Sequence, residues 1–319
     1  MVAALRLDPA TYARHALHAD TCAWVEKNCY IDVWIELVHA LGCDPHAMLP
    51  FVVALDFEGD QFTFFKPPHG ELWELYGLDV QELNVWKPLV EHAAEHLAAG
   101  KPISSEADAF WLPDVAGTDY RRAHVKSTII LNELDLAGKR LGYFHNASYY
   151  ALDGEDFERT FAPRELPLYA EYARLDRVVH RAPAELRARS GAALARHLAR
   201  RPADNPVARF AARFARDLPE LQARGLAYYH AWAFATVRQL GAAAELAALY
   251  LRWLADAADA GQFAPAAAAY DAISTGAKAF ILKAARAVNA KKPLDASATF
   301  AAWADAWQRA ITCLEQHAD

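Results

Sequence analysis

Two patterns of hydrophobic and polar residues divide the chain. From about Tyr169 to the C-terminus, apolar residues recur at helical spacing, as in the segment from Ala244 to Leu254. This spacing predicts amphipathic helices. Prolines and glycines divide the stretch into segments of ordinary helix length; they are Pro183, Pro202, Pro206, Pro219, Gly225, Gly261, Pro265 and Pro293. No motif recurs at a fixed interval, so the pattern favours a helical bundle over a solenoid.

The first half of the chain alternates between helical and strand-like patterns. Residues 28–41 predict a helix, because apolar residues follow at three-to-four spacing and Gly42 comes directly after them. Residues 51–55 and 61–65 are short apolar runs on either side of Glu58-Gly59-Asp60, and they predict a paired β-ribbon. A further helix is expected from Val80 to Ala99.

More strands are expected at residues 102–108, 124–131 and 141–144. The polar turn at residues 135–139 predicts that the last two form one antiparallel hairpin. A helix, an antiparallel sheet and a separate set of helices together predict an α+β fold. We expect one domain over residues 1–165 and an all-α domain over residues 166–319.

The composition excludes several classes of protein. The chain has 319 residues, 54% of them hydrophobic and 23% charged, which is enough apolar surface for a folded core. The net charge of −7 argues against binding to nucleic acid or to an anionic membrane surface. Neither a signal-peptide core nor a transmembrane window is present, so we expect a cytoplasmic protein. Four cysteines in so long a chain do not make a disulfide framework, so each must be core filler, a metal ligand or a nucleophile.

Cys29 is the candidate nucleophile because it opens the predicted helix that follows Asn28. A thiol at a helix N-terminus lies at the positive end of the helix dipole, which favours the reactive thiolate and supplies N–H donors for an oxyanion. The alternative is a buried, unreactive cysteine, since free cysteine packs well in protein cores.

A nucleophilic thiol needs a base, and the base needs a group that orients it. His124 begins one strand of the predicted hairpin and Asn146 ends the other, so both lie at the same edge of the sheet. With Cys29 at a nearby helix N-terminus, this arrangement predicts a Cys-His-Asn triad.

These segments resemble a known family. The helix-initiating Cys29, the Gly100-Lys101-Pro102 entry to a strand, the segment from Asp108 to Pro113, and the His124 strand are similar to the papain-like N-terminal domain of BtrH-like acyltransferases of butirosin biosynthesis. The whole chain also resembles a bacterial family of unassigned function whose members accompany amino-acid:carrier-protein ligases. The motifs support the likeness over residues 20–165, and helical character alone supports it beyond them.

The resemblance implies a papain-like core and acyl transfer through a cysteine thioester. An aminoacyl or peptidyl group would arrive on the phosphopantetheine arm of an acyl carrier protein and pass to an amine acceptor, with no bound cofactor. Cys29 would be the nucleophile, His124 the base and Asn146 the orienting group. Ala23 stands where papain-type enzymes usually place an oxyanion glutamine, so Asn28 would have to serve instead. A cysteine peptidase or amidase, and a non-catalytic carrier-protein-binding module on the same scaffold, remain alternatives.

Other polar groups allow competing interpretations. Cys43 and His46 are of zinc-ligating type but lack a second pair, and Asp56-x-Glu58-x-Asp60 lacks the rest of a calcium loop. Glu58, Asp60, Gln61 and Asp108 are instead candidates for binding substrate. Gly-rich phosphate loops and the Gly-x-Ser-x-Gly elbow are absent from the sequence. The arginines of the second half form either a solvated face or a docking surface for an acidic carrier protein; they are Arg196, Arg200, Arg201, Arg209, Arg213 and Arg216.

Overall fold

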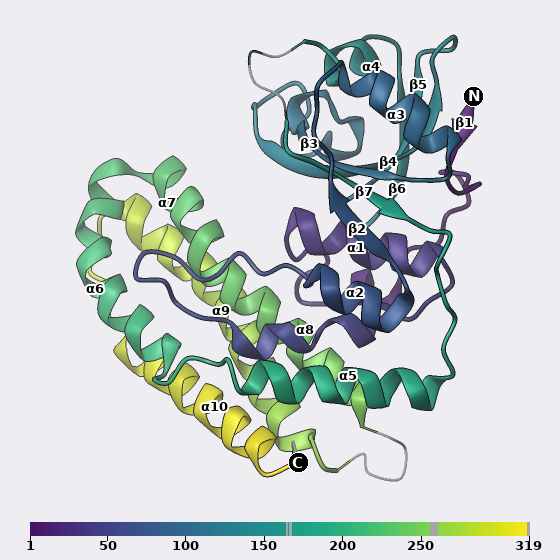
Figure 1. The fold of residues 1–319 in the computed structure, drawn as a ribbon. Helices are drawn as coiled ribbons and strands as arrows, with labels where there is room; N and C mark the ends of the chain where they lie inside the picture. Colours follow the sequence, from purple (N-terminus) through teal and green to yellow (C-terminus); the bar gives the residue numbers. More distant parts are fainter. Residues whose placement is uncertain (164, 166–167, 256–260, 318–319) are drawn as a thin grey trace. The chain divides into compact units, whose positions relative to one another are not determined.

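The computed structural model describes residues 1–163, 165, 168–255 and 261–317, and the fold is α+β (Figure 1). These residues divide into two compact units. The first comprises Met1–Ala19, Asn28–Pro45 and Pro68–Arg181, and the second comprises Asp20–Lys27, His46–Pro67 and Ala182–Asp319. The boundary expected between residues 165 and 166 falls beside residues 164, 166 and 167, which lie outside the described part.

The first unit contains a seven-stranded antiparallel sheet with the order β2-β7-β3-β4-β5-β6, and β1 pairs with β4. The strands are β1 (Val2–Ala3), β2 (Asp79–Glu82), β3 (Ile103–Asp108), β4 (Lys126–Asp135), β5 (Arg140–His145), β6 (Ser148–Asp153) and β7 (Ala170–Arg174). The helices of this unit are α1 (Cys29–Ala40), α2 (His69–Tyr76), α3 (Leu89–Ala98) and α4 (Gly154–Thr160), with short 3-10 turns η1 (Ala16–His18), η4 (Ala109–Trp111) and η5 (Pro113–Val115). The predicted hairpin is confirmed as β4 and β5.

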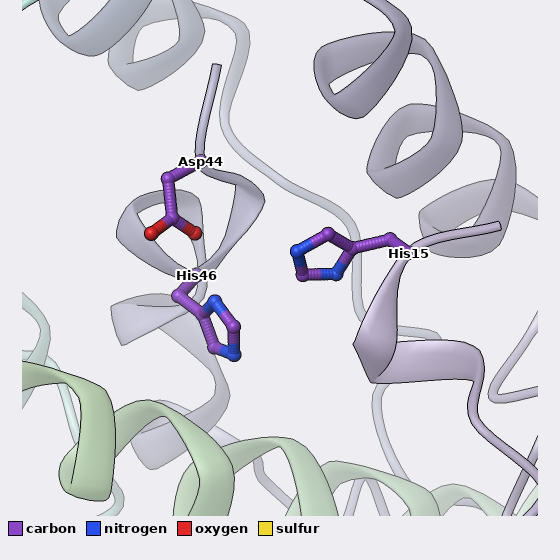
Figure 2. A group of neighbouring side chains, drawn as sticks. All are labelled: His15, Asp44 and His46. Carbon is purple, nitrogen blue, oxygen red and sulfur yellow. The ribbon is translucent and has the colours of Figure 1, made fainter. Parts of the chain in front are cut away.

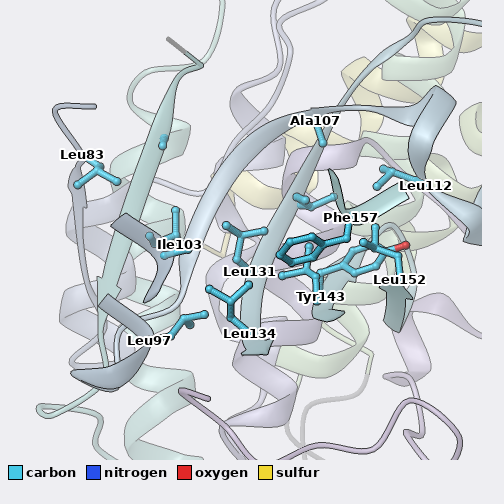
Figure 3. Packing of buried hydrophobic residues seen from close by; sticks show 14 residues of the cluster. Leu83, Leu97, Ile103, Ala107, Leu112, Leu131, Leu134, Tyr143, Leu152 and Phe157 are labelled. Atoms are coloured by element: carbon cyan, nitrogen blue, oxygen red, sulfur yellow. The ribbon is translucent and has the colours of Figure 1, made fainter. Parts of the chain in front are cut away.

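The two faces of the sheet carry different elements because side chains alternate along each strand. One face packs against α3 and α4, and Figure 3 shows Leu131 and Tyr143 of this face in one cluster with Leu97 of α3 and Phe157 of α4. The opposite face packs against α1, which contacts β4, β5 and β6. The N-terminus of α1 therefore lies on the face of β4 that carries Thr128.

Three predictions for the first unit and its neighbouring segments were wrong in part. Residues 50–54 form a 3-10 helix, η3 (Pro50–Ala54), and only an isolated bridge joins Phe57 to Phe62. A short apolar run does not distinguish a strand from a buried helical turn, and Pro50 favours the turn. The helix expected from Val80 begins at Leu89, after Pro88, because residues 79–82 pair with β7. β7 itself lies in a stretch that was expected to be helical.

The second unit is helical. Its helices are α5 (Pro183–Leu198), α6 (Pro206–Arg224), α7 (Leu226–Ala233), α8 (Gln239–Leu254), α9 (Ala264–Ala290) and α10 (Ser297–Glu315), with η2 (Pro45–Met48), η3 and a π-helical turn, η6 (Phe234–Arg238). Pro183, Pro206 and Pro265 lie in the first turn of their helices, as the sequence indicates. Pro219 does not divide the chain, because it lies inside α6.

Polar contacts explain why two early segments belong to the helical unit. Glu245 of α8 accepts hydrogen bonds from the N–H groups of Ala23 and Trp24, and its carboxylate lies 3.4 Å from the ammonium of the fully buried Lys27. Arg213 of α6 donates to the carbonyl of Gly59 at 2.6 Å. Among the described residues, no helix is both long and apolar enough to cross a membrane.

Candidate functional site

Cys29 is the first residue of α1, and its position is fixed by the capping residue before it. The side-chain oxygen of Asn28 accepts hydrogen bonds from the N–H groups of Tyr30 at 3.1 Å and Ile31 at 3.0 Å. The predicted helix start is therefore confirmed. The oxygen of Asn28 caps the helix, while the N–H of Cys29 has no acceptor within the described residues. Cys29 is a free thiol of intermediate exposure.

The residue that faces the Cys29 thiol is Thr128 of β4. The sulfur lies 3.6 Å from the Thr128 hydroxyl oxygen. Across the sheet, Thr128 pairs with Glu106 of β3. On its other side the register of β4 and β5 ends where Ile129 pairs with His145, and Asn146 lies in the turn that follows. The thiol thus lies over a row formed by Glu106 and Thr128.

His124 lies outside this row and has a different partner. Its Nδ1 lies 2.7 Å from the carboxylate oxygen of Asp108, and its ring stacks on Phe110 with centroids 4.3 Å apart. The side chain of His124 is 68% exposed. Four residues of extended chain, from Thr128 back to His124, span roughly 13 Å. Within the described residues, neither Cys29 nor Asn146 forms a hydrogen bond with His124.

Asp108 therefore occupies the orienting position that was assigned to Asn146. Its second oxygen accepts a hydrogen bond from the N–H of Phe110 at 3.1 Å, which fixes the carboxylate beside His124. Asn146 is the first of two turn residues between β5 and β6, and its φ of 46° is in the left-handed region. Asparagine tolerates this conformation better than most residues, which gives it a conformational role in the turn.

The remaining substrate-binding candidates belong to the second unit. Asp60 and Gln61 line a polar pocket of about 220 Å³ together with Arg213 and Asp217 of α6. Glu58 accepts a hydrogen bond from the Thr63 hydroxyl at 3.2 Å. Asp108 is thus the one member of the predicted substrate-binding set that lies in the unit of Cys29.

The sequence analysis missed a second titratable cluster near the start of α1. The Tyr30 hydroxyl donates to Glu171 of β7 at 2.8 Å and lies 2.8 Å from the Nε2 of His69. His69 is itself 3.3 Å from the Glu171 carboxylate. Burial, followed by the charge of Glu171, raises the pKa of the Tyr30 phenol. No spacing along the chain could have indicated this cluster, because β7 was not predicted as a strand.

A buried ionic cluster holds α1 in place. His18 lies 3.1 Å from Asp32 and 2.5 Å from Glu36, and all three side chains are fully buried. Burial lowers the pKa of His18, but hydrogen bonds and charge attraction from the two carboxylates together raise it above its ordinary value of 6.5. Because Asp32 and Glu36 lie one and two turns after Cys29, this cluster anchors the helix that presents the thiol.

Figure 2 shows His15, Asp44 and His46, three side chains of metal-ligating type. His15 and Asp44 belong to the first unit, whereas His46 begins the second. Two ligands within one unit do not form a structural zinc site, which takes four. We therefore assign no metal chemistry to these residues.

Comparison with known proteins gives a family for nearly the whole chain. The DUF1839 N-terminal domain model matches residues 13–175, and the DUF1839 C-terminal domain model matches residues 183–316. No curated protein matches the chain. The chain belongs to the DUF1839 family.

Proposed function

We propose that the protein is a cytoplasmic, cysteine-dependent acyltransferase. In this proposal Cys29 takes an aminoacyl or peptidyl group from a carrier-protein thioester and passes it to an amine. The observation that carries the proposal is the placement of a free, partly exposed thiol at the capped N-terminus of α1, beside an N–H that has no acceptor among the described residues. That N–H and the helix dipole would stabilise the oxyanion of a tetrahedral intermediate.

The proposed reaction has two steps. His124 takes the proton of the Cys29 thiol, the thiolate attacks the thioester carbonyl, and the phosphopantetheine thiolate leaves with that proton. The acceptor amine then attacks the Cys29 thioester, His124 takes the amine proton, and the Cys29 sulfur is released and reprotonated. Asp108 holds Nδ1 of His124, so Nε2 is the nitrogen that exchanges protons. The reaction requires the exposed imidazole to approach the thiol when substrate binds.

Carrier-protein docking by the second unit is part of the proposal. Arg209 and Arg213 already form ion pairs with Asp204 at 3.0 Å and Asp217 at 2.6 Å, and Arg201 pairs with Glu315. Exposed Arg200 and Arg216 are better candidates for contacting an acidic carrier surface. The sequence motifs around Cys29 and Asp108 resemble those of the papain-like BtrH-like acyltransferases, and this resemblance supports the proposed acyl transfer.

A non-catalytic binding protein is the second candidate. It is favoured by one observation, that the residue in contact with the thiol is Thr128 whereas His124 hydrogen-bonds to Asp108. A threonine hydroxyl is a poor base, so among the described residues the thiol has no basic group at hydrogen-bond distance.

Intact mass spectrometry after incubation with an aminoacyl-loaded carrier protein tests the proposal. We expect an acyl adduct on the wild-type chain, its loss in Cys29→Ala, and its retention in Cys22→Ala and Cys43→Ala, which remove cysteines of the same intermediate exposure. His124→Gln should slow acylation by about 100-fold or more. An adduct that persists in Cys29→Ala would refute Cys29 as the nucleophile. The absence of any adduct with competent carrier proteins would favour the binding protein, and release of free acid in place of amide would indicate a hydrolase.

A further inference from the structure

A serine, a histidine and an aspartate form a chain of hydrogen bonds on the face of the sheet that packs against α3 and α4. The Ser127 hydroxyl oxygen is 2.7 Å from Nε2 of His145, and Nδ1 of His145 is 2.5 Å from a carboxylate oxygen of Asp114. Ser127 comes from β4, His145 from the end of β5 and Asp114 from η5. Three separate elements therefore converge on one imidazole.

The hydrogen-bond network determines the direction of every proton in this cluster. The Tyr143 hydroxyl donates to the second oxygen of Asp114 at 2.5 Å. Burial, followed by the charge of Asp114, raises the pKa of the Tyr143 phenol, so it remains a donor at neutral pH. A carboxylate accepts from Nδ1, so in a neutral His145 imidazole Nδ1 carries the proton and Nε2 is an acceptor. In that tautomer the Ser127 hydroxyl donates to Nε2, which is the polarity that activates a serine nucleophile.

All three side chains of the relay are buried. The side chains of His145 and Asp114 are 1% and 2% exposed, and Ser127 as a whole residue is 7% exposed. Ser127 is the second residue of β4 and follows Val125 and Lys126, whose exposures are 44% and, for the lysine side chain, 59%. The residue opposite Ser127 on β3 is Ala107, a small side chain.

The relay is separate from the Cys29 site. Ser127 and Thr128 are consecutive on one strand, so their side chains point to opposite faces of the sheet. Thr128 contacts the Cys29 thiol on the face that packs against α1. The Ser127 side chain lies instead on the face of Ile129 and Tyr143, which packs against α3 and α4.

We propose that Ser127, His145 and Asp114 form a second nucleophilic site that cleaves small acyl esters. The Ser127 oxygen attacks the ester carbonyl while its proton passes to Nε2 of His145. The tetrahedral intermediate collapses, the ester C–O bond breaks, and the leaving alcohol takes the proton from Nε2. Water then attacks the acyl-serine, gives a proton to Nε2, and releases the acid as the proton returns to Ser127. The activity is independent of the proposed function of Cys29.

A fluorophosphonate and an activated ester test this proposal on the full chain. We expect diisopropyl fluorophosphate to add one diisopropyl phosphoryl group, with loss of fluoride, and peptide mapping to place it on Ser127. Hydrolysis of p-nitrophenyl acetate should fall by about 100-fold or more in Ser127→Ala and in His145→Gln. Ser105→Ala is the matched control, because Ser105 is a buried serine, 2% exposed, on the same face of neighbouring β3.

Two further measurements keep this test distinct from that of Cys29. Cys29→Ala should retain both the phosphoryl adduct and the esterase activity, whatever its effect on acyl transfer. The position of the adduct in the wild-type chain does not depend on whether any variant folds. An unmodified Ser127 in the folded wild-type protein, or ester hydrolysis unchanged in a folded Ser127→Ala protein, would overturn the proposal.

Discussion

Replacing His18 by glutamine removes the buried imidazole that links the N-terminal segment to α1. In the wild-type protein this ring lies between the carboxylates of Asp32 and Glu36, and none of the three side chains is accessible to solvent. Without the imidazolium, two buried negative charges face each other. Removing one partner of a buried ionic cluster typically costs about 3–5 kcal/mol. The Tyr12 hydroxyl and the His15 N–H still donate to Glu36, so we expect a loss near the lower end, about 3 kcal/mol.

The stabilisation that His18 contributes depends on pH and decreases as the pH rises. The pKa of His18 in the folded protein is raised above 6.5, so the folded state holds its proton more tightly than the unfolded state. This contribution to stability is fully present below pH 6.5 and is lost as the pH rises through the folded pKa. Between those two pKa values, the contribution of His18 should fall by about 1.4 kcal/mol for each pH unit.

Urea denaturation followed by circular dichroism at intervals from pH 5.5 to 9 measures this dependence. The difference in the free energy of unfolding between the wild type and His18→Gln should be largest at low pH and should decrease above pH 6.5. His180→Gln is the control, since this exposed histidine hydrogen-bonds to the carbonyl of Leu41 and lies outside the buried cluster, and its difference curve should be flat. A wild-type minus His18→Gln difference that stays constant or grows with pH would refute a protonated His18.

Two further substitutions test the elements that carry the sites. Asn28→Ala should lower the free energy of unfolding by about 1 kcal/mol because α1 loses its cap. Asn28→Ser should retain most of the wild-type stability, because serine is also a capping residue. Equal stability of the two variants would contradict the capping role. Gly142→Ala places a methyl group 3.0 Å from Cβ of Glu133 and in collision with the Tyr149 hydroxyl, and should destabilise by about 1–3 kcal/mol in urea denaturation. Gly70→Ala in α2 meets nothing within 4 Å and should be neutral or stabilising, so a similar loss in both glycine variants would refute the steric explanation.

The elements that could be predicted from sequence are those with strong local determinants. The helix that begins at Cys29 combines a capping asparagine, regular apolar spacing and a terminal Gly42 with a φ of 73°. The β4–β5 hairpin combines two apolar runs with a polar turn between them. Each of these signals lies within about 20 residues of chain, so no distant contact was needed to interpret it.

Elements that depend on distant partners were missed. β2 and β7 pair residues 79–82 with residues 171–174, and neither run has the length or alternation that identifies a strand alone. The segment at residues 50–54 pairs with no strand of the described residues, and its apolar run folds as a 3-10 turn in the helical unit. In both cases tertiary contacts, and not local propensity, determined the conformation.

The candidate sites depended on strand register even more closely than the fold did. The sequence pattern predicted His124 and Asn146 at one edge of the sheet but could not assign residues to faces, because adjacent residues on a strand point in opposite directions. His145 and Asn146 are neighbours, yet His145 contacts Ser127, whereas Asn146 lies in the turn between β5 and β6. A shift of one residue in the register would exchange the two faces. His124 was expected beside the thiol but lies beside Asp108, whereas His145, which was not predicted as a site residue, lies beside Ser127. The Ser127 relay could therefore be identified only by geometry.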